Sequence, residues 1–88
     1  MDYRICRHAE WEITRRGIPI TSVQAVMAHP EQRLVDESRE DRWIYQSRVP
    51  SEDGKMNLLR VVVDEVETPS VIITAYRTSK IEKYWSTK

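Results

Sequence analysis

The spacing of hydrophobic positions changes after residue 31, and this change predicts helices before it and strands after it. Over residues 4–16 four apolar side chains fall within one arc of about 100° on a helical projection, the buried stripe of an amphipathic helix. The members of this arc are Ile5, Cys6, Ala9 and Ile13. Arg16 shares the arc, and Gly17 then supplies the left-handed residue at which helices commonly end.

A second helix is expected from about Pro19 to Ala28, directly after the first. Thr21 and Gln24 have the spacing of a capping box, with a hydroxyl at the cap and an amide three residues later. Pro30 prevents the helix from continuing, because proline lacks the backbone donor that a helix needs. The two helices are therefore expected to form an αα-hairpin.

Beyond residue 31 the apolar residues recur with a period of two, which is typical of strands. The pattern predicts four strands, at about residues 33–37, 42–49, 58–64 and 71–77. The third, LLRVVVD, is the most apolar and is expected at the centre of the sheet. The order of elements predicts one α+β domain over residues 1–88, with two N-terminal helices packed on one face of a four-stranded antiparallel sheet (ααββββ).

The charges balance over the whole chain but not along it. Fourteen basic residues match fourteen acidic residues, so the net charge does not indicate nucleic-acid binding. Residues 1–16 carry a net charge of +1, residues 17–69 of −4 and residues 70–88 of +3. The basic ends form one positive surface if the fold brings them together.

Cysteine content and hydropathy exclude several classes of protein. Cys6 is the only cysteine, which rules out an internal disulfide and a cysteine-rich metal site. The histidines, His8 and His29, have no further ligands at metal-binding spacing, and there is no glycine-rich cofactor loop. No apolar stretch resembles a signal peptide or a membrane span. The sequence predicts a cytoplasmic protein that uses no cofactor, metal or membrane.

Three polar side chains on the predicted helix and central strand are candidates for chemistry. His8 has the side chain best suited to proton transfer near neutral pH, or it simply caps or packs on its helix. Arg16 holds a phosphate at the rim of the core, or forms a salt bridge with the acidic middle segment. Arg60 interrupts the central strand, where a buried cation is costly, so it opens onto a groove or pairs with Asp64 on the same face.

The end of the chain combines rings and cations, the mixture that binds single-stranded RNA by stacking and phosphate contacts. Its members are Tyr76, Arg77, Lys80, Lys83, Tyr84 and Trp85. The alternative is that Tyr84 and Trp85 cover the edge of the sheet.

The order and spacing of several short motifs resemble a known family. His8-Ala9, Arg16-Gly17-Ile18, Val23 and Pro30 are similar to the start of the bacterial family filed as domain of unknown function 4258. The segments 59–64 (LRVVVD) and 73–76 (ITAY) resemble its central and final strands. That family is similar to the BrnT toxins and to the RelE/ParE toxin superfamily.

The resemblance implies a toxin of a type II toxin–antitoxin system that cleaves RNA without a metal and is silenced by a cognate antitoxin protein. The positions carried over are His8, Arg16, Arg60, Thr74 and Tyr76. Of these, His8, Arg16, Arg60 and Tyr76 are the predicted catalytic residues, and Arg77, Lys80 and Lys83 are the predicted RNA-binding residues.

Two other functions remain open from the sequence. The first is a non-catalytic protein-interaction module, favoured by the neutral charge and by Trp43 and Tyr45 on a strand expected to face solvent. The second is an inhibitor of DNA gyrase, the target of the ParE branch.

Overall fold

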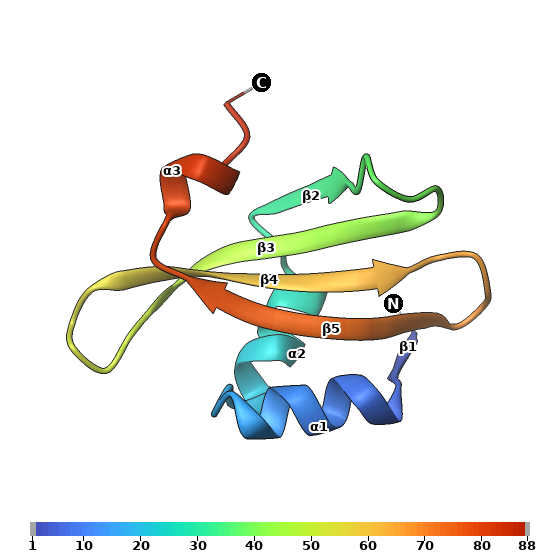
Figure 1. Ribbon diagram of the computed structural model, residues 1–88, viewed down its shortest axis with the longest axis horizontal. Coiled ribbons are helices and arrows are strands. Elements are labelled where there is room, and N and C mark those ends of the chain that lie inside the picture. Colours follow the sequence, from blue (N-terminus) through green and yellow to red (C-terminus); the bar gives the residue numbers. More distant parts are fainter. Residues whose placement is uncertain (1, 88) are drawn as a thin grey trace.

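The computed structural model describes residues 2–87 and is an α+β fold built on one five-stranded sheet (Figure 1). Its elements are β1 (Tyr3–Ile5), α1 (Arg7–Arg15), α2 (Ile20–Ala28), β2 (Gln32–Val35), β3 (Arg42–Pro50), β4 (Met56–Asp64), β5 (Ser70–Thr78) and α3 (Ile81–Tyr84). The strand order is β1-β5-β4-β3-β2, so β4 is central as predicted.

The four predicted strands form an antiparallel meander, but the sheet is mixed because β1 pairs with β5 in parallel. The prediction of a helix from residue 4 is therefore wrong. Tyr3 and Ile5 meet Ser70 and Ile72 across the edge of β5, and this long-range pairing outweighs the local helical pattern.

The helix starts also differ from the prediction. Cys6 caps α1, its sulfur accepting a hydrogen bond of 3.4 Å from the backbone N–H of Ala9. The expected capping box of α2 is absent from the structure, because the helix already begins at Ile20 after an extended Pro19 and has no side-chain cap. Gly17 ends the first helical segment with a φ of +65°, as expected.

Both helices contribute to a core on one face of the sheet, as the sequence predicted. Its buried members are Ala9, Ile13, Ile18, Val23, Val26, Met27, Tyr45, Leu59, Val61, Val63, Ile72 and Ala75. Tyr45 is only 2% exposed, so the expectation that its strand presents it to solvent is wrong. Odd-numbered residues of β4 face this core, and Arg60 projects from the opposite face.

The two long helices occupy different positions. In Figure 1, α1 runs along the outer side of β5, whereas α2 lies behind the sheet. The short α3 lies at the end of the sheet where β5 finishes. No helix within residues 2–87 is long and apolar enough to cross a membrane.

Candidate active site

Three polar residues, one helical turn apart, line the side of α1 that faces β5. We call His8, Glu12 and Arg16 the inner stripe. The Nε2 atom of His8 lies 2.9 Å from Oε1 of Glu12, and NH2 of Arg16 lies 2.6 Å from Oε2 of the same carboxylate. Residues four apart share a helix face, so one carboxylate holds both an imidazole and a guanidinium.

The hydroxyl of Thr74 on β5 completes this cluster. It donates a hydrogen bond of 2.9 Å to Glu12 and accepts one of 3.2 Å from NH1 of Arg16. The hydroxyl, with smaller contributions from Arg16 and His8, lowers the pKa of Glu12 below its ordinary value of 4.5, against the opposing effect of burial. Glu12 is therefore ionised near neutral pH.

Arg16 is held by the edge of the sheet and still reaches the surface. Its NH1 also donates to the backbone carbonyl of Ala75 at 2.8 Å, and Arg77 in turn donates to the carbonyl of Arg16 at 2.9 Å. These contacts use three of the five N–H donors of the Arg16 guanidinium. With a third of its side chain exposed, Arg16 keeps donors for a ligand.

A second polar group crosses the sheet on the face opposite the core. Gln32, Gln46, Arg60 and Tyr76 are register neighbours on β2, β3, β4 and β5, and we call them the polar row. Arg60 donates a hydrogen bond of 2.9 Å to Gln46 and one of 2.7 Å to the phenol oxygen of Tyr76. Gln46 donates to Gln32 at 2.7 Å, so the row is continuous.

The C-terminal segment covers the polar row. The ring of Tyr84 packs on the Arg60 guanidinium, with 4.3 Å between the guanidinium carbon and the ring centroid. Gln46 donates to the carbonyl of Tyr84 at 3.1 Å, and Gln32 exchanges two hydrogen bonds with the backbone of Ser86. Tyr84 thus covers the face of the sheet over the central strand β4, and not the edge that the alternative sequence interpretation gave it.

Arg60 departs from both arrangements expected of it. It is 7% exposed, so it does not open onto a groove, and none of the ion pairs formed within residues 2–87 includes it. The Arg60 guanidinium contacts uncharged oxygens and aromatic rings in place of the expected carboxylate. The sequence could not indicate these contacts, because the groups come from β3, β5 and the end of the chain.

The predicted catalytic residues fall into two neighbouring groups. His8 and Arg16 share Glu12, while Arg60 and Tyr76 share a hydrogen bond. β5 links the groups, because Thr74 and Tyr76 are two positions apart on that strand and therefore project from the same side.

The predicted RNA-binding residues are more dispersed. Arg77 contacts the end of α1, whereas Lys80 precedes α3 and the Lys83 ammonium lies 5.3 Å from the ring centroid of Tyr84. Arg77 also lines a cavity of about 540 Å³ between α2 and β3, which none of the four predicted catalytic residues lines.

Sequence reasoning missed Glu12 and Gln46. The four-residue spacing of His8, Glu12 and Arg16 carries the signal for the first, since a carboxylate midway between a histidine and an arginine on one helix face meets both. Nothing local marks Gln46. Across the described part of the chain, no cluster of three or more His, Cys, Asp or Glu side chains is arranged to hold a metal ion.

Comparison with protein families matches residues 5–77 to the family described as Domain of unknown function (DUF4258). The chain belongs to this family. The matched region runs from β1 into β5 and contains all four predicted catalytic residues of this DUF4258 protein. Searches of curated proteins and of solved structures found no match.

Proposed function

We propose that this DUF4258 protein is an endoribonuclease toxin that cleaves RNA by attack of the ribose 2′-OH, without a metal ion. The observation that carries the proposal is the inner stripe, in which one ionised carboxylate holds an imidazole and a guanidinium at the surface. Proton transfer and positive charge near a phosphate are the two requirements of this reaction.

His8 is the proposed general base. Its side chain is 69% exposed, so a ribose can reach it, and Glu12 fixes the orientation of the ring through Nε2. The other ring nitrogen then takes the proton from the 2′-OH, and the 2′ oxygen attacks the adjacent phosphorus. Glu12 also stabilises the imidazolium that forms, which is the usual role of a carboxylate beside a catalytic histidine.

Arg16 is the proposed phosphate ligand. Its backbone and side-chain contacts to β5 fix the guanidinium before the substrate arrives, so the positive charge needs little rearrangement. The remaining N–H donors bind the non-bridging oxygens, where negative charge grows in the transition state.

Tyr76 is the proposed general acid. Its phenol proton passes to the departing 5′ oxygen, which leaves a 2′,3′-cyclic phosphate and a 5′-hydroxyl as products. Arg60 donates a hydrogen bond to the phenol oxygen and would stabilise the negative charge that develops there. In this scheme Arg60 acts through Tyr76 and does not touch the RNA, whereas Arg77, Lys80 and Lys83 contact the flanking backbone.

The proposed biological role rests on the resemblance of the sequence motifs to the BrnT toxins and the RelE/ParE superfamily. We infer that a cognate antitoxin protein binds and silences this chain. A short DNA-binding protein encoded in the adjacent reading frame would support this assignment.

The test is cleavage of RNA by the purified protein in EDTA, with and without ribosomes. We expect new 5′-hydroxyl and 2′,3′-cyclic phosphate ends, and rates lower by about 10²–10⁴-fold in His8→Ala. Arg39→Ala, which removes an exposed arginine in the β2–β3 turn, is the matched control for Arg16→Ala. If the wild-type protein leaves RNA intact both with and without ribosomes, the proposal is wrong.

A protein-interaction module is the second candidate, and the zero net charge favours it, because ribonucleases need to attract a polyanion. This function predicts a tight protein partner and no growth arrest on expression. Inhibition of gyrase, the third function, would leave cellular RNA intact while inducing a DNA-damage response.

A further inference from the structure

A second line of side chains runs beside the inner stripe on α1. Arg7, Trp11 and Arg15 each precede one inner-stripe residue in the sequence and are likewise spaced four apart, and we call them the outer stripe. By helix geometry the two arginines flank Trp11 at about 6 Å on either side along the axis. The outer stripe is thus a ring between two cations, next to His8, Glu12 and Arg16.

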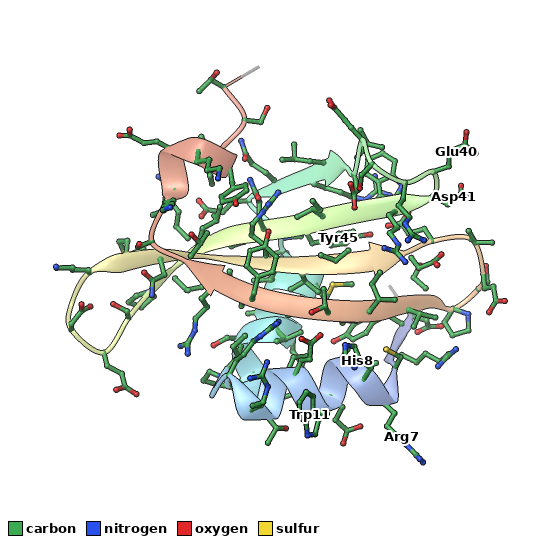
Figure 2. The ribbon with its side chains drawn as sticks, viewed as in Figure 1. Arg7, His8, Trp11, Glu40, Asp41 and Tyr45 are labelled. Carbon is green, nitrogen blue, oxygen red and sulfur yellow. The ribbon has the colours of Figure 1, made fainter. Side chains whose placement is uncertain are left out.

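Trp11 is exposed where the fold gives no reason for a large ring. It is 58% exposed and is not part of the buried core, although α1 has an apolar face of its own. Figure 2 shows Trp11 projecting away from the sheet, with His8 on the side of the helix nearer β5. An exposed tryptophan that the core does not use is a common feature of binding surfaces.

The neighbours of Trp11 match the chemistry of an unpaired nucleotide. The Arg15 guanidinium lies 4.9 Å from the centroid of the Trp11 ring, and the His8 ring lies 6.3 Å away at an interplanar angle of 29°. Proteins bind single-stranded RNA by stacking bases on aromatic rings and arginine planes, with cations on the flanking phosphates.

We propose that the outer stripe is a base-stacking subsite for single-stranded RNA. The base next to the scissile phosphate stacks on Trp11, and Arg7 and Arg15 bind the phosphates on its two sides. The inference rests on the proposed function, since His8 links the stacked base to the reacting ribose. Paired bases are stacked within their helix and cannot offer a free face, so the subsite selects unpaired RNA.

The experiment measures binding separately from cleavage. The probe is a short single-stranded RNA of mixed sequence with 2′-O-methyl groups on every ribose, which removes the attacking hydroxyl. Fluorescence anisotropy of the labelled probe gives the dissociation constant for the full-length protein. A duplex of the same sequence is expected to bind more weakly than the single strand.

Trp11→Ala is expected to weaken binding of the probe by about 5- to 150-fold, the range for loss of one base–aromatic stack. Trp11→Phe should recover most of the affinity, because phenylalanine retains a stacking face. Val66→Ala removes another exposed apolar side chain, far along the chain in the β4–β5 turn, and should leave binding unchanged. Equal affinities for wild type and Trp11→Ala, with both proteins folded, would overturn the proposal.

The outcomes separate this inference from the cleavage reaction. If binding of the probe depends on Trp11 but the protein cleaves no RNA, the subsite proposal is supported and the endoribonuclease proposal is wrong. If Trp11→Ala changes neither the affinity for the probe nor kcat/KM for RNA cleavage, the subsite proposal is wrong and the endoribonuclease proposal stands. If Trp11→Ala abolishes capture of a protein partner but the wild type does not bind the RNA probe, the outer stripe is a protein interface and the proposal fails.

Discussion

The hydroxyl of Thr74 donates a hydrogen bond of 2.9 Å to the carboxylate of Glu12, across 62 positions of the sequence. The same oxygen accepts a bond from Arg16. This hydroxyl therefore joins the last strand to the helix that carries the proposed base and phosphate ligand, and the geometry of the inner stripe depends on it.

Thr74→Val should reduce both stability and cleavage. Valine keeps the shape of threonine but leaves the largely buried Glu12 carboxylate without one donor, which costs about 1–3 kcal/mol of unfolding free energy. Urea denaturation measures this cost. Thr21→Val, at an exposed position on α2, is the control and should change stability by less than about 0.5 kcal/mol. Similar losses in both variants would show that the Thr74 contact is unimportant.

Stability should fall in acid through Glu12. The pKa of Glu12 is lowered in the folded protein, chiefly by Thr74, so the ionised form stabilises the fold. This contribution is fully present above the ordinary value of 4.5 and is lost as the pH falls through the lower, folded-state pKa. The difference in unfolding free energy between wild type and Glu12→Gln should therefore shrink below about pH 4.5.

Glu12→Gln also tests the positioning role of this residue. We expect kcat to fall while KM changes little, because His8 loses the carboxylate that orients its ring and stabilises the imidazolium formed during the reaction. An unchanged kcat in a folded Glu12→Gln protein would show that the carboxylate does not position His8.

Tyr76→Phe should lower the rate of RNA cleavage by about 10²-fold or more while leaving affinity for the 2′-O-methylated RNA intact. The phenol is the proposed acid, and its removal leaves Arg60 with its contact to Gln46. Full activity in Tyr76→Phe together with no activity in His8→Ala would assign both proton transfers to His8.

Arg60 should be protected from arginine-specific reagents. Tyr84 and the backbone around it cover the polar row, whereas Arg39 lies exposed in the β2–β3 turn and serves as the internal control. Mass spectrometry should find Arg39 modified and Arg60 unmodified in the intact protein. Deletion of residues 81–88 should expose Arg60 to the reagent, and modification of Arg60 in the full chain would show that the segment does not cover it.

Local sequence determined the elements and the order of most of them. The change from helical to strand spacing, the stop at Gly17 and the apolar run of β4 are properties of neighbouring residues, so they could be read without the fold. The same holds for the α+β class and the antiparallel order of β2 to β5. Family membership was also indicated by short motifs, and the match over residues 5–77 confirms it.

Only the tertiary structure decided what each end of the chain contacts. Residues 3–5 form a strand because the edge of β5 lies beside them, and Arg60 is buried because Tyr84 returns to cover it. The grouping of Glu12 with Thr74 depends likewise on α1 lying along β5. Pairing energy between distant segments has no local signature, since it exists only once folding has placed their backbones and side chains within hydrogen-bonding distance.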